Sequence, residues 1–421
     1  MMDDLSRRGF LATVAAVPTG LALAAQVQAA PDDSQYWERV ADLFDAPPPG
    51  IIQLENGHFG AMTRSVRMAY AAHIERVNRE TTLYTRGAIG PDLRAVRVKV
   101  ATLLGVDPTE IAFTRGGTES MQTLILGYNR LRAGDAVLYA DLDYDSMQTA
   151  MESLTQRRGV RVVKIALPEP ASHDAIIAAY AEALQANPHV RMVLLTHLSH
   201  RTGLIPPVAE IIALAREHEA DVLLDCGHAL GQTDFSLRAM GVDFAGLNLH
   251  KWIGSPLGVG VVYIRRDRIG DIDVSPLEVH SDTIDARVHT GSINYAALLT
   301  VSDAIDVHDR IGVANKAGRL RFLRDRWTRA LRGTPGIEIL TPDDPAMYAG
   351  ITSFRLTGVT SMAANAALRK SLFDRWNIFT IERDGPSRGA CIRVAPSFIN
   401  TPHHIDRLIA AVDALRIEKR A

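Results

Sequence analysis

A single lysine, Lys251, follows an apolar run in the stretch NLHKWIGSPLGVG at residues 248–260. A lysine at the end of a buried strand is costly to desolvate unless it is paired, neutralised or covalently engaged. Taken alone, it could also be a surface lysine that extends its amine to solvent. A primary amine held in a dry site is the group that enzymes use to form imines with carbonyl compounds. Lys251 is therefore a candidate for covalent catalysis.

Two further groups follow apolar runs in the same part of the chain. Asp225 ends the run DVLLD, although a lone aspartate there could simply cap the next turn. The segment RGGTES at residues 115–120 follows the run EIAFT and precedes an apolar helix pattern. Glycines and a threonine at the start of a helix form an anion cradle, because backbone N–H groups, the helix dipole and a hydroxyl converge there. Residues 115–120 are therefore a candidate phosphate-binding loop.

An aromatic side chain completes this set. Tyr144 follows the run AVLYADLD and could cover a flat ring, although a structural role is the default for a tyrosine alone. A phosphorylated aromatic aldehyde needs a lysine for the imine, a carboxylate that keeps a pyridine nitrogen protonated, an aromatic stacking partner and a phosphate cradle. The lysine, the aspartate, the tyrosine and the glycine loop supply these groups. The sequence therefore predicts pyridoxal 5'-phosphate as the cofactor.

Apolar runs that alternate with helical patterns must position these groups. Such runs fall at residues 110–114, 136–140, 160–166, 190–196, 221–225 and 259–264. Unbroken apolar runs separated by amphipathic helices are typical of strands buried on both faces of a mainly parallel α/β sheet. Ligands of such sheets bind at the carboxyl ends of the strands, which is where the candidate residues stand.

The first thirty residues have the layout of an export signal. Paired arginines at 7–8 precede a weakly apolar run, and the residues VQA at 27–29 offer a cleavage point. The order S-R-R-x-F-L resembles a twin-arginine signal, whose pathway carries folded proteins. Pro18 and Gly20 interrupt the run, which argues against a stable membrane anchor. We expect a mature chain that starts near Ala30 and reaches the periplasm through the twin-arginine translocase.

The pattern of the chain changes near residue 295. A long helical tract is expected over 295–333, with isolated strands near 337–340, 351–356 and 391–395 and helices near 361–373 and 402–416. We therefore expect a signal peptide at 1–30, an N-terminal segment at 31–63 that joins the small domain, a large cofactor-binding domain at 64–295 and a smaller α+β domain at 296–421.

The bulk composition excludes several classes of function. The 421 residues carry a formal net charge of −2, which gives no long-range field to attract nucleic acid. Cys226 and Cys391 are the only cysteines, too few for a disulfide scaffold or a four-cysteine metal site. We expect both thiols to be small buried hydrophobic groups, and we expect no metal site.

The order and spacing of these motifs resemble the class V aminotransferases, a family of fold type I pyridoxal-phosphate enzymes that includes cysteine desulfurases and isopenicillin N epimerase. The resemblance covers nearly the whole mature chain, and LENGHFGAM at 54–62 has the epimerase-like form. It implies a large domain with a mainly parallel seven-stranded sheet and a smaller α+β C-terminal domain. It also implies a homodimer, because HTGSIN at 289–294 is similar to a segment that reaches the phosphate of the neighbouring subunit.

The resemblance implies a role for each residue that matches a family motif. Lys251 forms the imine, and Asp225 contacts the pyridine nitrogen. The other cofactor-binding residues that it implies are the Gly117 backbone, Thr118 and His250 at the phosphate, Ser292 at the neighbouring subunit's phosphate, Tyr144 on the ring, and His200 and His228 near the phenolic oxygen. Arg393, in CIRVAPSFINT, is implied to grip a substrate carboxylate. His58 would either line the pocket or be structural.

These roles predict chemistry at the Cα of an amino acid, or of an amino-acid-containing peptide, through an external aldimine. Lys251, with its pKa lowered in a dry site, would move the proton at Cα. Return of that proton to the opposite face gives epimerisation, delivery to the cofactor gives transamination, and loss of a β substituent gives elimination. The sequence leaves these outcomes open. Export favours periplasmic tailoring of a secreted peptide or siderophore, similar to pyoverdine maturation.

Other functions are less well supported by the residues. A desulfurase would need a mobile cysteine on the loop at 382–390, which has none, and Cys391 would face the same side as Arg393 with little reach. Arg383 or Arg388 in that loop could select the substrate or be solvated. A ligand-binding protein on the same fold would be expected to have lost the lysine or the aspartate. A dehydrogenase would need G-x-G-x-x-G, a spacing that residues 115–120 lack.

Overall fold

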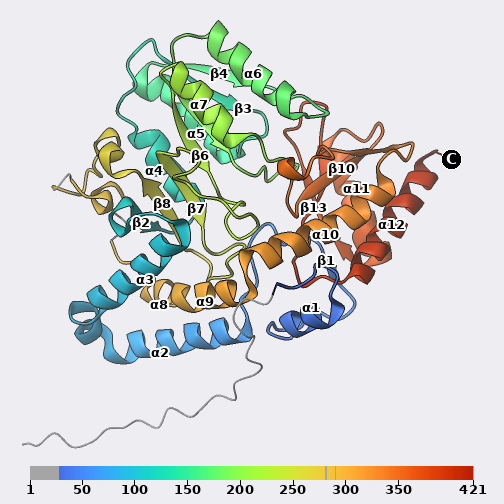
Figure 1. Ribbon diagram of the computed structural model, residues 1–421, viewed down its shortest axis with the longest axis horizontal. Coiled ribbons are helices and arrows are strands. Elements are labelled where there is room, and N and C mark those ends of the chain that lie inside the picture. The colour runs from blue at the N-terminus through green and yellow to red at the C-terminus, as the bar shows by residue number, and fades with distance from the viewer. Residues whose placement is uncertain (1–27, 280–281, 290, 421) are drawn as a thin grey trace, which may run out of the picture.

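The computed structural model describes residues 28–279, 282–289 and 291–420 (Figure 1). A larger α/β unit lies beside a smaller C-terminal unit, which is drawn in orange and red in Figure 1. Nearly all of the predicted signal at 1–30 lies outside the described residues. In the described part of the chain, no helix combines the length and the apolar character needed to cross a bilayer.

The large unit is built around a seven-stranded sheet with the strand order β2-β8-β7-β6-β5-β3-β4. Its strands are β2 (Ile111–Thr114), β3 (Ala136–Ala140), β4 (Arg161–Ile165), β5 (Val190–Thr196), β6 (Asp221–Asp225), β7 (Phe244–Asn248) and β8 (Gly260–Ile264). Strand β8 is antiparallel to β7 and β2, and the other pairs are parallel. The predicted mainly parallel seven-stranded sheet is confirmed.

Helices cover both faces of this sheet. The helices of the large unit and the N-terminal segment are α1 (Ser34–Ala41), α2 (Arg64–Arg86), α3 (Ile89–Leu104), α4 (Gly117–Gly127), α5 (Asp145–Arg158), α6 (His173–Ala186), α7 (Val208–Glu217), α8 (Tyr295–Leu299) and α9 (Val301–Ile311). Val137 and Tyr139 of β3 pack with α4 and α5 on one face, whereas Leu138 packs with α6 and α7 on the other. Because successive strand residues point to opposite faces, a strand covered on both sides must be apolar throughout.

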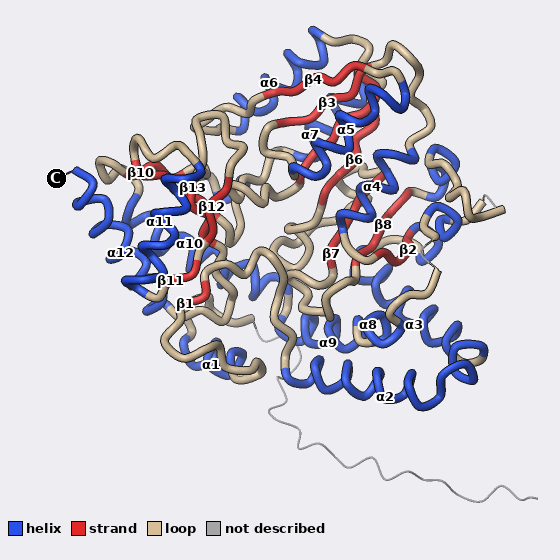
Figure 2. The backbone as a smooth tube through the Cα atoms, turned by 180° about the vertical axis from the view of Figure 1, so that it is seen from behind, coloured by secondary structure: helices blue, strands red, loops and turns tan. Residues whose placement is uncertain are grey.

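The smaller unit contains a four-stranded antiparallel sheet with the order β12-β13-β10-β9, visible from behind in Figure 2. Its elements are α10 (Val313–Leu331), β9 (Ile337–Ile339), β10 (Thr352–Leu356), α11 (Met362–Trp376), β11 (Ile378–Phe379), β12 (Ile381–Arg383), β13 (Cys391–Val394) and α12 (Pro402–Arg420). Strand β1 (Ile52–Gln53) pairs in parallel with β11, so the N-terminal segment is joined to the small unit. The predicted smaller α+β unit at the C-terminal end is confirmed.

Two expectations about the C-terminal half differ from the structure. The helical tract expected over 295–333 is three helices, broken at Thr300 and at Gly312. Gly312 has a φ of 86°, a conformation that favours glycine and ends α9. The loop expected at 382–390 begins as strand, because Glu382 and Arg383 belong to β12 and pair with β13.

Candidate active site

A cavity of about 540 Å³ opens where the strands of the large sheet end and the small unit approaches them. Both units contribute lining residues. The cavity brings together these residues singled out in the sequence: His58, Gly117, Thr118, Tyr144, His200, Asp225, His228, His250, Lys251 and Arg393. Parallel α/β sheets place their ligands at this edge.

The amine of Lys251 lies inside this cavity and is held by a histidine. Its Nζ is 2.9 Å from Nε2 of His228. Because an ammonium group can only donate hydrogen bonds, Nε2 is the acceptor. Burial lowers the pKa of Lys251 to about 8, and the Asp225 carboxylate acts in the opposite direction. Roughly a tenth of this amine is therefore unprotonated at pH 7 and about half at pH 8, far more than for an ordinary lysine.

Asp225 is the last residue of β6 and faces the same cavity. Its Oδ1 accepts a hydrogen bond of 2.8 Å from the backbone N–H of Gly227. Burial raises the pKa of Asp225, while the Gly227 N–H and the charge of Lys251 oppose the shift. A protonated ring nitrogen placed against this carboxylate would be stabilised by it, and would hold the carboxylate ionised in return.

The candidate phosphate end is formed by the start of α4 and by the residues after β7. Gly116 precedes the helix and offers no side-chain cap. Oδ1 of Asn248 accepts a 2.7 Å hydrogen bond from the Gly117 N–H, so the donor expected to face the phosphate is already engaged. Nδ1 of His250 donates to the Val259 carbonyl at 2.9 Å, which leaves Nε2 as the ring's second nitrogen. Thr118 lines the cavity in the first turn of the helix.

Asn248 was missed by sequence reasoning. It links the phosphate end to the aspartate end, since its Nδ2 also donates to the Gly227 carbonyl at 3.4 Å. A Cβ placed on Gly117 would lie 3.0 Å from that Nδ2, so any larger residue there would crowd the Asn248 amide. Asn248 ends β7 three residues before Lys251, and this position was the feature of the sequence that could have identified it as a site residue.

Aromatic and polar side chains form the wall between these ends. Tyr144 stands edge-on to His200, with ring centroids 5.1 Å apart and planes at 87°. The rings of His200 and His228 are nearly parallel, at 21°, with centroids 6.4 Å apart. Among the described residues, Oγ1 of Thr196 and Nδ1 of both histidines are buried without a hydrogen-bond partner. Buried polar atoms normally have partners, so this wall suits a polar ligand.

The residues present fit pyridoxal phosphate. The helix start with Thr118 suits its phosphate, Asp225 suits its ring nitrogen, and Lys251 suits its aldehyde carbon. The unpartnered histidine and threonine atoms suit the polar substituents of its ring.

The substrate end differs from the expectation for Arg393. Its Nε donates to Oε2 of Glu55 at 3.1 Å, its Nη2 contacts Oε1 of the same carboxylate, and its Nη1 donates to the His200 carbonyl at 2.7 Å. The guanidinium predicted to bind a substrate carboxylate therefore already holds a carboxylate of its own chain. Glu55 was missed, although it stands in the quoted LENGHFGAM segment.

Three further residues lie away from the cavity. Ser292 is exposed and does not line the cavity of its own chain; its expected role concerns a neighbouring subunit and stays a prediction. Cys391 is fully buried, with Sγ 3.9 Å from the Arg201 carbonyl, and burial raises its pKa to about 11. Cys226 is also fully buried, and burial raises its pKa. Neither thiol lines the cavity.

Similar proteins are consistent with this site. Isopenicillin N epimerase of Streptomyces clavuligerus is 29% identical over 390 residues, which span 87% of this chain and 95% of the epimerase. The structure of the cysteine desulfurase CsdA from Escherichia coli superposes with a TM-score of 0.75 at 20% identity, covering 91% of this chain and 98% of that one. A C-DES variant with glycine covalently linked to its PLP cofactor also has a TM-score of 0.75, at 22% identity, covering 86% and 96%.

The family comparison covers most of the chain. The model of the class V aminotransferases matches residues 62–373, which is more than half of the 421 residues. With the lysine, the aspartate and the helix start gathered in one cavity, the chain belongs to the class V aminotransferase family and is a pyridoxal-phosphate-dependent enzyme.

Proposed function

We propose that this protein is an exported enzyme that acts at the Cα of an amino acid, or of a peptide that contains one, as an epimerase or an aminotransferase. The observation that carries the proposal is the Lys251 amine, held 2.9 Å from His228 in a cavity that also contains Asp225. An amine with a pKa of about 8 can both take and return a proton near neutral pH.

The residues of the chain have distinct tasks in this proposal. When bound, pyridoxal phosphate supplies an aldehyde that holds the substrate amine and a ring that accepts the electrons released at Cα. Asp225 keeps the ring nitrogen protonated, so the ring can accept those electrons. Lys251 removes the proton from Cα and returns it. His228 orients the Lys251 amine through Nε2, and Tyr144 and His200 cover one wall of the cavity.

The cavity lining favours epimerisation or transamination over sulfur transfer. A desulfurase needs a thiol that reaches the substrate, and neither cysteine lines the cavity. The near full-length similarity to isopenicillin N epimerase also supports chemistry that ends with proton transfer at Cα. A C–S lyase is the second candidate, because the proteins similar in sequence include putative L-cysteine desulfhydrases.

Export and dimerisation are part of the proposal. The Pro31 carbonyl accepts a 2.8 Å hydrogen bond from Nη1 of Arg319 in α10, a contact that a mature chain starting near Ala30 keeps. This contact supports a mature protein that folds without the signal. In the proposal, the exported enzyme tailors a secreted peptide or siderophore, as in pyoverdine maturation. Cell fractionation tests the location, with a variant in which Arg7 and Arg8 are both lysine as the export-deficient control. Sedimentation equilibrium tests the dimer, and a monomer that binds the cofactor tightly would contradict it.

The reaction type is tested in deuterated water. The cofactor-loaded protein is incubated with amino acids and peptides, and the products are followed by mass spectrometry and chiral chromatography. Deuterium at Cα with inverted configuration identifies an epimerase, and a keto acid identifies an aminotransferase. Sulfide or ammonia with an unsaturated product would overturn both assignments in favour of a lyase. Lys251→Ala is the control that should abolish every product.

A further inference from the structure

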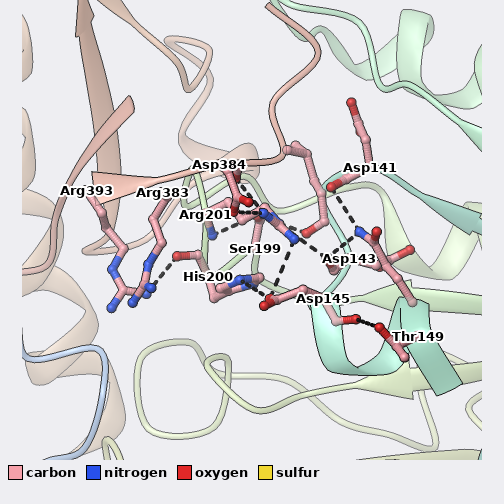
Figure 3. Close-up of polar contacts among 12 residues, drawn as sticks. Asp141, Asp143, Asp145, Thr149, Ser199, His200, Arg201, Arg383, Asp384 and Arg393 are labelled. Atoms are coloured by element: carbon pink, nitrogen blue, oxygen red, sulfur yellow. Dashed lines mark hydrogen bonds and ion pairs between the residues drawn. The ribbon is translucent and has the colours of Figure 1, made fainter. Parts of the chain in front are cut away.

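Two arginines of the small unit reach the same end of the cavity. Arg383 ends β12 and Arg393 lies in the neighbouring β13, and both line the cavity. Figure 3 shows the two side chains side by side, with their guanidinium groups turned the same way beside the segment that carries His200. The two groups differ in what they bind.

Arg393 is engaged in a fixed, buried ion pair. The side chains of Arg393 and Glu55 are 1% and 6% exposed. The residues on either side of Glu55 are hydrogen-bonded to Ala395, which directly follows β13. The Ala395 N–H donates to the Leu54 carbonyl at 2.8 Å, and the Asn56 N–H donates to the Ala395 carbonyl at 3.0 Å. A Cβ on Gly57 would lie 2.9 Å from Nη2 of Arg393, so the two segments are closely packed. Removing one partner of such a pair is strongly destabilising, which argues against Glu55 leaving to admit a substrate.

Arg383 forms only a longer ion pair with the same carboxylate. Its Nη2 is 3.6 Å from Oε1 of Glu55, beyond hydrogen-bond distance, and its Nε is buried with no hydrogen-bond partner among the described residues. The side chain is 27% exposed. The Glu55 carboxylate is therefore hydrogen-bonded by Arg393, and the guanidinium donor left unused at this end of the cavity is Nε of Arg383.

The position of Arg383 is fixed by the next residue. Nη1 of Arg201, in the large unit, donates to Oδ1 of Asp384 at 2.7 Å and to its carbonyl at 2.5 Å (Figure 3). A Cβ on Gly385 would lie 2.3 Å from the same Nη1, so the backbone passes directly over the Arg201 guanidinium. The contact between Asp384 and Arg201 therefore holds the neighbouring Arg383 against the large unit, close to the residues that line the cofactor cavity. Burial is the main cause of the low pKa of Lys251, and the charges of Arg393 and Arg383 contribute to it.

We propose that Arg383, rather than Arg393, binds the substrate carboxylate, and that Glu55 neutralises Arg393 so that the cavity selects substrates with a free carboxylate close to the reacting amine. The substrate class is therefore the α-amino carboxylate, free or at an unblocked position of a peptide, and excludes the corresponding amides and simple amines. This inference rests on the proposed function.

The test uses two reagents that attack any lysine-bound pyridoxal phosphate. Aminooxyacetate carries a carboxylate, whereas O-methylhydroxylamine lacks one, and each discharges the yellow chromophore as it forms an oxime. The ratio of their second-order rate constants measures carboxylate recognition without knowledge of the substrate. Arg383→Gln is compared with Arg388→Gln, because Arg388 lies in the same segment, pairs with Glu338 at 3.4 Å and does not line the cavity.

We expect Arg383→Gln to lower the preference for aminooxyacetate by roughly 10- to 100-fold, the range for a lost hydrogen bond to a charged group. Arg388→Gln should leave the preference unchanged. Glu55→Gln should raise it, because Arg393 then has no carboxylate partner. An unchanged preference in Arg383→Gln, or a fall in Glu55→Gln, would overturn the assignment. A wild-type protein that forms no chromophore with pyridoxal phosphate would instead contradict the proposed function.

Discussion

The reactivity of Lys251 depends on how much of its amine is unprotonated near neutral pH. Burial depresses the pKa of this residue to about 8, well below the 10.5 of an ordinary lysine. Only the free amine attacks an aldehyde. When apoprotein is mixed with pyridoxal phosphate, the rate of chromophore formation should rise with pH and reach half of its maximum near pH 8. Stopped-flow absorbance measures this profile. A rate that still rises steeply above about pH 9.5 would show an ordinary lysine.

Asp225 allows a second test at the residue scale. Asp225→Asn keeps the size of the side chain and the acceptor for the Gly227 N–H, but removes the charge that would stabilise a protonated ring nitrogen. The variant should still take up pyridoxal phosphate and become coloured. Its exchange of the Cα proton for deuterium should fall on the order of 100-fold, as when a preorganised electrostatic partner is lost. Deuterium incorporation measured by mass spectrometry checks this, and wild-type exchange would refute the role of Asp225.

Single residues show where sequence reasoning reaches its limit. The lysine and the aspartate could be predicted because each lies at the carboxyl end of a buried strand: Asp225 ends β6, and Lys251 comes three residues after β7. Glu55 could not, because it meets Arg393 across 338 positions and only the folded chain brings the two together. Asn248 stands in the same stretch as Lys251, yet its bond to the Gly117 N–H depends on how β7 and α4 pack.

At the scale of elements, strands buried on both faces were the most predictable. The runs at 136–140, 190–196 and 221–225 match β3, β5 and β6 residue for residue, because an apolar run with polar ends leaves no choice of register. The short strands β11 and β12 have no such pattern. Their pairing depends on the N-terminal segment and on β13, which are distant in sequence.

Helix α10 carries a buried lysine that yields a third prediction. Lys316 is 2% exposed, its Nζ donates to the Trp252 carbonyl at 2.5 Å, and it is 3.0 Å from Nδ1 of His308. Burial lowers the pKa of Lys316 to about 7, with Asp309 opposing. The pKa of Lys316 is lower in the folded state than the 10.5 of the unfolded state, so the unfolded chain binds this proton more readily. The contribution of Lys316 to stability is therefore complete only above pH 10.5 and is lost as the pH falls through 7.

Lys316→Met should therefore flatten the pH dependence of stability. Between about pH 7.5 and 9.5 the wild-type protein should gain up to about 1.4 kcal/mol per pH unit from this residue, and the variant should not. Thermal melting of the apoproteins over this range gives the comparison. Parallel profiles of Tm against pH would show that Lys316 does not titrate in this window.

At the scale of the whole molecule, the cavity exists because two units meet. The large unit supplies the lysine, the aspartate and the helix start, and the small unit supplies both arginines. The ion pair of Arg201 with Asp384 and the bond from Arg393 to the His200 carbonyl join the units at the cavity wall. The order of motifs along the chain was sufficient to predict the two units and the cofactor. These contacts between the units were not predictable, because each joins residues more than 180 positions apart.

The central claim is that Lys251 holds pyridoxal phosphate covalently, and borohydride reduction tests it most directly. Reduction of the loaded protein, followed by proteolysis and mass spectrometry, should place a single pyridoxyl phosphate group on the peptide that contains Lys251, with none on Lys251→Ala. Lys316, the other buried lysine with a depressed pKa, is the internal comparison. A label on Lys316 or on surface lysines, or none at all, would contradict the account.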